Sequence, residues 1–165
     1  MRNIEIQNSN PWREKLLKTL DVNYSKAPHY SEVMEFIEPI VSNPDNNLSQ
    51  YNVNAITEIA KKIGIDSSNI MMSSELDYKG VSNEMLISLI KTVGGNAYLC
   101  GSGADGYQDD KMFIDAGIEV IYQNYKQPEY EHHSGKKYTP GLSIIDALMN
   151  CGVAGVKLIL GLNSK

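Results

Sequence analysis

The chain has 165 residues, a mass of 18.3 kDa and a formal net charge of −5. Its length is sufficient for one domain with a sizeable core, and its 42% hydrophobic and 21% charged residues are typical of a globular protein. The acidic balance argues against a nucleic-acid or anionic-lipid partner, and no apolar run reaches the length of a membrane span.

The N-terminus and the cysteines bear on the cellular compartment. Residues 1–10 are polar and lack the apolar centre of a signal peptide. The two cysteines do not have the spacing of a disulfide framework, which favours reduced thiols. We therefore expect a cytoplasmic protein.

The first third of the chain has the apolar spacing of helices. Asn10 is a potential cap for the first of them, because asparagine side chains accept hydrogen bonds from the first free N–H groups of a helix. Pro39 predicts a kink or an early end of the second helix. The predicted helices cover about residues 11–24, 32–41 and 49–63.

The rest of the chain alternates between short strands and helices. Strands are predicted over residues 69–73, 97–100 and 118–123, and helices over 83–93, over 107–116 and after Ser143. Alternation of this kind is typical of a parallel sheet with crossing helices. The sequence therefore predicts an α/β fold, with a helical N-terminal third followed by a small, mostly parallel sheet, in a single domain of residues 1–165.

A glycine-rich loop over residues 101–106 follows a predicted strand and precedes a predicted helix. It matches the pattern G-x-G-x-x-G, but it lies past the midpoint of the chain, and no acidic residue ends the next strand. These two features argue against a nicotinamide cofactor, and we predict no cofactor. Two interpretations stay open: a plain glycine turn, or a phosphate or carboxylate site formed by the backbone N–H groups of Gly101, Ser102 and Gly103.

Several side chains near these loops are candidates for chemistry. Cys100 ends a predicted strand, where a nearby helix N-terminus would favour the thiolate, although a free cysteine is often simply a small buried residue. Cys151 is better explained by packing. In the polar loop, either His132 or His133 could contact substrate or act as a general base, whereas a metal site lacks an identifiable third ligand, so we predict none.

Two serine–acid combinations have simpler explanations than catalysis. Ser143 and Asp146 have the spacing of a capping box, in which each side chain satisfies a backbone N–H at a helix start. Glu75, after Ser73 and Ser74, lies either in a turn or in a site at the sheet edge. The loops also carry several tyrosines, which either bind sugars and nucleobases or pack half-buried: Tyr78, Tyr107, Tyr122, Tyr125, Tyr130 and Tyr138.

An ordered set of segments resembles the WbqC-like protein family, which is found with genes for bacterial O-antigen and capsule synthesis. The set comprises Ile4-Glu5-Ile6, Trp12, Tyr24, Lys26-Ala27-Pro28, Leu48, Asn52, Ser73-Ser74-Glu75-Leu76, Tyr98-Leu99-Cys100-Gly101, Tyr107, Gly117-Ile118, Tyr130, Pro140, Leu142-Ser143-Ile144-Ile145-Asp146 and Asn150-Cys151-Gly152. Members of the family usually begin with an extra N-terminal segment. We therefore expect this chain to match the C-terminal part of a longer WbqC-like domain.

The resemblance implies a protein that modifies a sugar or nucleotide sugar in surface-polysaccharide biosynthesis, with acyl or aminoacyl transfer as the reaction. Under this hypothesis either Cys100 or His132 supplies the chemistry. The alternative is a non-enzymatic binding or scaffold module of a polysaccharide-synthesis complex. A missing segment would expose a sheet edge and promote self-association. Substrate contacts are expected from Glu75, Tyr98, Gly101, Ser102, Gly103, Tyr107 and Tyr130.

Overall fold

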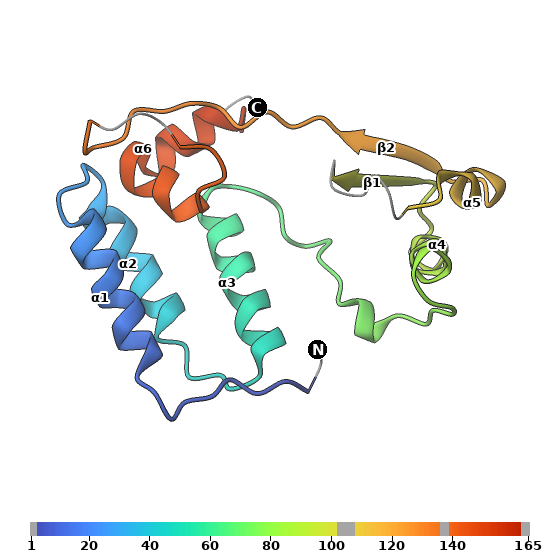
Figure 1. Ribbon diagram of the computed structural model, residues 1–165, viewed down its shortest axis with the longest axis horizontal. Coiled ribbons are helices and arrows are strands. Elements are labelled where there is room, and N and C mark those ends of the chain that lie inside the picture. Colours follow the sequence, from blue (N-terminus) through green and yellow to red (C-terminus); the bar gives the residue numbers. More distant parts are fainter. Residues whose placement is uncertain (1–2, 102–107, 136–138, 163–165) are drawn as a thin grey trace. The chain divides into compact units, whose positions relative to one another are not determined.

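The computed structural model describes residues 3–101, 108–135 and 139–162 (Figure 1). The chain divides into two compact units. Unit 1 comprises Met1–Asn69 and Gln127–Lys165, and unit 2 comprises Ile70–Lys126. Each unit therefore has its own packing, and the expectation of a single domain stays a prediction.

Unit 1 is helical and is organised around α2 (Tyr30–Val41). This helix packs against α1 (Trp12–Tyr24), α3 (Leu48–Lys62) and α6 (Ile144–Ile159) (Figure 1). The three N-terminal helices agree with the predicted ranges to within two residues. The core is formed mainly by side chains of α2 and α6 that are at most 2% exposed: Val33, Ile37, Leu148, Met149 and Val156.

Two local features of unit 1 differ from the prediction. Asn10 makes no side-chain cap, since the residue at the start of α1 is Pro11 and no side-chain cap bond is formed there. The start of α3 is capped by Asn47, whose Oδ1 accepts the N–H of Gln50 at 3.1 Å. Pro39 does not end α2, which runs on to Val41, because a missing N–H near the end of a helix removes only one hydrogen bond.

Helix α6 is broken at Gly152, where φ is 69° and ψ is 173°. An ideal Cβ placed there would lie 2.5 Å from the Nδ1 atom of His29. The backbone N–H of His29 also donates to the carbonyl of Met149 at 3.2 Å. The imidazole ring therefore occupies the space beside a positive-φ position that only glycine fills without strain.

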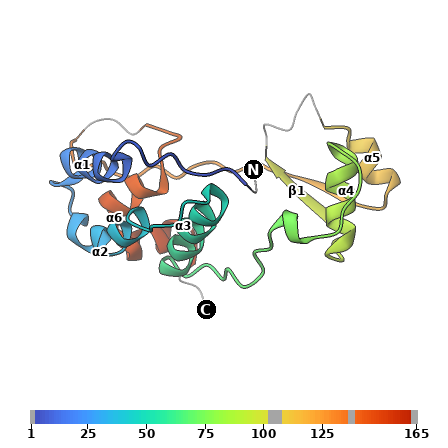
Figure 2. The same ribbon diagram turned by 90° about the horizontal axis from the view of Figure 1, so that it is seen from below.

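Unit 2 contains the sheet, whose strands β1 (Ala97–Gly101) and β2 (Glu119–Gln123) pair in parallel. Helix α5 (Asp110–Asp115) forms the crossover between them and contacts both β2 and α4 (Asn83–Thr92) (Figure 2). Phe113 of α5 is fully buried and stacks on Tyr98 of β1 at 5.2 Å between ring centroids. The predicted α/β fold, with helices first and a small parallel sheet after them, is confirmed.

The strand predicted over residues 69–73 is wrong. The chain there is irregular and leads into a single 3-10 turn, η1 (Ser73–Glu75). Ile70 and Met71 are 47% and 58% exposed, so this apolar run has no buried face to support a strand. No helix in the described ranges is both long enough and apolar enough to cross a membrane.

Replacing Gly152 by alanine should cost about 1–3 kcal/mol in the free energy of unfolding, because it combines positive-φ strain with a clash against a packed ring. Gly161 is a matched control, since it has the same φ of 69° in the turn after α6, and an ideal Cβ there would meet no described atom within 4 Å. Denaturant unfolding of both variants gives the two costs.

The Gly152→Ala variant should lose more stability than Gly161→Ala, and His29→Ala should recover part of that difference in the double variant. Equal losses for the two glycine variants would show that backbone strain alone accounts for the effect and that the His29 ring contributes nothing.

Candidate functional site

The candidate site of unit 1 is built around the carboxylate of Asp146, which is 1% exposed in the first turn of α6. Ser143 caps this helix as predicted, because its Oγ accepts the N–H of Ile145 at 3.3 Å. Asp146 does not complete the capping box. Its Oδ1 and Oδ2 atoms accept the hydroxyl protons of Tyr24 at 2.9 Å and Tyr130 at 2.7 Å. Such donors offset the cost of removing a carboxylate from water.

His132 is the third group on this carboxylate, with its Nε2 atom 3.3 Å from Oδ1 of Asp146. Its other ring nitrogen, Nδ1, accepts the backbone N–H of Ser134 at 3.2 Å. A nitrogen that accepts a backbone N–H carries no proton of its own, so the proton of the neutral ring is on Nε2 and points at Asp146. The lone pair of the ring is therefore on Nδ1, where it accepts this N–H.

Asn150 fixes the loop that carries His132 onto α6. Its Oδ1 accepts the backbone N–H of His133 at 2.7 Å and lies 2.9 Å from Nδ1 of the same residue. Its Nδ2 donates to the carbonyl of Asp146 at 2.8 Å. The ring of His133 stacks on that of His132 at 4.4 Å between centroids. Asn150 therefore acts as a positioning residue for the histidine pair.

Asp146 and Asn150 were not predicted from the sequence as site residues. The available signal was their spacing of four on an otherwise apolar helix, which places two polar side chains on one face. For Asp146 the capping-box pattern offered a simpler explanation, because it assigns the carboxylate to a backbone N–H at the start of the same helix.

The buried carboxylate affects the acidity of two neighbours. Burial, together with the hydrogen bond and the negative charge of Asp146, raises the pKa of Tyr24 to about 12. Burial, and secondarily the same charge, raises the pKa of the Cys151 thiol. A thiol that holds its proton more tightly is a poor nucleophile, which agrees with a packing role for Cys151.

Several other predicted site residues lie in unit 2. Cys100 is 3% exposed, with its Sγ atom 3.6 Å from the carbonyl of Ile121 and 3.8 Å from Nε2 of Gln108. Gly101 ends β1 and Glu75 ends η1, both exposed, while Tyr98 is half-buried on β1. Ser102, Gly103 and Tyr107 lie outside the described residues, so the anion-binding loop stays a prediction.

The structure therefore brings Tyr130 and His132 together on Asp146, and it places Cys100 beside Tyr98 and Gly101 on one strand. Across residues 3–101, 108–135 and 139–162, no group of three or more His, Cys, Asp or Glu side chains is arranged to hold a metal ion.

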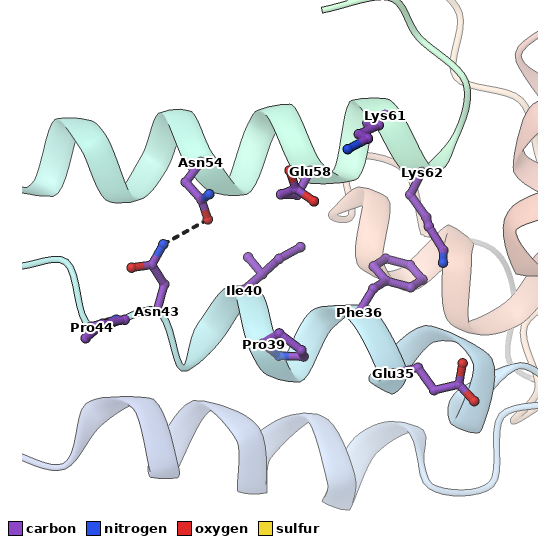
Figure 3. Close-up of a pocket in the computed structure, with 10 residues that line it drawn as sticks. All are labelled: Glu35, Phe36, Pro39, Ile40, Asn43, Pro44, Asn54, Glu58, Lys61 and Lys62. Atoms are coloured by element: carbon purple, nitrogen blue, oxygen red, sulfur yellow. Dashed lines mark hydrogen bonds between the residues drawn. The ribbon is translucent and has the colours of Figure 1, made fainter.

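A second feature of unit 1 is a groove of about 790 Å³ between α2 and α3 (Figure 3). Asn43 donates to Asn54 across it at 2.9 Å, and the ammonium group of Lys62 lies 5.1 Å from the ring centroid of Phe36. Its size suits a small molecule. None of the described residues that line it is a histidine, cysteine, serine or tyrosine: the lining consists of Glu35, Phe36, Pro39, Ile40, Asn43, Pro44, Asn54, Glu58, Lys61 and Lys62.

Comparison with known proteins identifies the family. The model of the WbqC-like protein family matches residues 1–158. The chain belongs to the WbqC-like protein family. The match includes both units. It does not tell which part of a longer WbqC-like domain this chain corresponds to, so the expectation of a C-terminal part stays a prediction.

A relative of this chain occurs in Mycobacterium tuberculosis, where it is described as uncharacterized protein Rv1507c. It is 28% identical over 143 residues, which are 86% of this chain and 61% of the relative. This chain therefore spans less than two thirds of the relative's length. No solved structure matches this WbqC-like protein.

The replacement Asp146→Asn should lower the pKa of Tyr24, because it removes the negative charge that adds to the effect of burial. The pKa should stay above the ordinary value of 10.0, since burial is the largest cause of the shift. Alkaline titration followed by tyrosinate absorbance measures this, with Tyr24→Phe identifying the late-titrating group. An unchanged titration curve in Asp146→Asn would contradict the contact.

The same shift predicts how stability depends on pH. The pKa of Tyr24 is about 12 in the folded chain and near 10.0 when unfolded, so above pH 10 the unfolded chain releases this proton first. The free energy of unfolding should therefore fall between about pH 10 and pH 12, and more steeply in the wild type than in Tyr24→Phe. Denaturant melts across this range give both slopes, and parallel slopes would contradict the prediction.

Proposed function

We propose that this WbqC-like protein transfers an acyl or aminoacyl group to a sugar or nucleotide sugar in surface-polysaccharide biosynthesis, in the cytoplasm. The observation that supports the reaction type is the contact between His132 and the buried carboxylate of Asp146. The sugar class is what the family resemblance implies. The lone pair on Nδ1 of His132 then serves as a general base.

The chemistry needs one proton carrier. The hydroxyl or amine of the acceptor sugar gives its proton to Nδ1 of His132, and its oxygen or nitrogen bonds to the acyl carbonyl carbon. The bond from that carbon to the leaving group of the activated donor then breaks, and the leaving group takes the proton from Nδ1. Asp146 stabilises the imidazolium that exists between these two steps.

The tyrosines around Asp146 have a positioning role in this proposal. The hydroxyls of Tyr24 and Tyr130 each donate to one carboxylate oxygen, which fixes the plane of the group that faces His132. Tyr130, predicted as a substrate contact, therefore contributes mainly by orienting Asp146.

The substrate contacts of unit 2 remain part of the proposal. Gly101 ends β1 at its carboxyl end, where ligands commonly bind in parallel α/β sheets. The remaining proposed contacts are Glu75, Tyr98, Ser102, Gly103 and Tyr107, with Cys100 as an alternative reactive group.

Removing the base tests the proposal. His132→Ala should lower the transfer rate by about a hundred- to ten-thousand-fold, the usual contribution of a general base. Suitable donors are acetyl-coenzyme A and a glycyl thioester, and suitable acceptors are UDP- and dTDP-linked sugars and amino sugars. Mass spectrometry of the acceptor measures the transferred group.

His133→Ala is the matched control, because His133 stacks on His132 but contacts Asn150 rather than the carboxylate. It should keep most of the rate. Equal rates in the wild type and His132→Ala would overturn the proposed base. Wild-type protein that transfers nothing across the panel would overturn the enzyme proposal and support a binding or scaffold module instead.

A further inference from the structure

The hydroxyl of Ser134 extends the contact between His132 and Asp146 into a relay of three residues. Its Oγ atom lies 2.8 Å from Nδ1 of His132, and Nε2 of that ring lies 3.3 Å from Asp146. We propose, on the basis of the proposed function, that Ser134 is the nucleophile that carries the acyl group between donor and acceptor.

The direction of the hydrogen bonds supports this role. Nδ1 of His132 carries no proton, and its single lone pair is shared between the backbone N–H of Ser134 at 3.2 Å and the closer hydroxyl of the same residue at 2.8 Å. At 2.8 Å the hydroxyl donates its proton along the path that a nucleophilic serine needs. The ring orientation is fixed from both sides, by Ser134 at Nδ1 and by Asp146 at Nε2.

A local turn explains only half of this arrangement. A serine two residues after a histidine forms such a contact within a turn, and the N–H of Gly135 closes this one on the carbonyl of His132 at 2.8 Å. That turn requires nothing at the other ring nitrogen. Nε2 nevertheless meets a carboxylate that is 1% exposed and comes from another helix, which is the arrangement that activates a nucleophile.

Ser134 is exposed in the loop. The carboxylate of Asp146, on the other side of the ring, is closed to solvent.

The reaction would take place in two balanced steps with an acyl thioester as donor. Oγ of Ser134 bonds to the acyl carbon, its proton moves to Nδ1 of His132, and the carbon–sulfur bond breaks with the thiolate taking that proton. The acceptor hydroxyl or amine then gives its proton to Nδ1 and attacks the seryl ester. The ester bond breaks, and Oγ takes the proton back.

Covalent labelling tests the proposal in the full chain. A fluorophosphonate probe should modify Ser134, as located by peptide mass spectrometry. Labelling should disappear in Ser134→Ala and slow by about a hundred- to ten-thousand-fold in His132→Ala. Ser31→Ala, which changes another exposed serine of unit 1, should label like the wild type. Thermal unfolding checks that the variants fold.

The outcomes separate the two proposals. Transfer that survives in Ser134→Ala but is lost in His132→Ala would overturn the nucleophile and leave His132 as a base for direct transfer. Transfer that survives in both variants would overturn the proposed base as well, and a wild type that transfers nothing would overturn the proposed function. The role of Ser134 would also be overturned if the probe did not label the wild type. The same holds if the probe labelled His132→Ala as fast as the wild type.

Discussion

The burial of the Asp146 carboxylate is the constraint on which the candidate site depends. A carboxylate that is 1% exposed persists only with hydrogen-bond donors around it, and this one draws them from separate parts of the chain. Tyr24 ends α1, while Tyr130 and His132 lie in the loop before α6. Satisfying one buried charge therefore fixes the end of a helix, a loop and the orientation of an imidazole ring.

Helix α6 combines this site with the core because its faces differ in chemistry. Leu148 and Met149 are fully buried against α2, whereas Asp146 and Asn150, one turn apart, hold the loop. The helix is broken at Gly152, and Val156 beyond the break is also buried in the core.

Much of the fold could be predicted from the sequence, because helix periodicity and strand–helix–strand alternation are local signals. The parallel pairing of β1 and β2 follows from the short helix between them. The strand predicted over residues 69–73 is wrong because apolar composition does not show whether a partner strand exists. The role of Asp146 was missed for a similar reason: its partner Tyr24 lies 122 positions away, and no local pattern reveals such a contact.

The contrast between the thiols and His132 favours chemistry in unit 1. The Sγ atom of Cys100 is buried against the backbone of β2, and Cys151 has a raised pKa. Each of these arrangements suits packing better than attack on a substrate. His132, in contrast, has one nitrogen held on a carboxylate and the other presenting its lone pair to a hydroxyl. A reaction that moves a proton to and from one nitrogen needs this asymmetry, and acyl transfer is such a reaction.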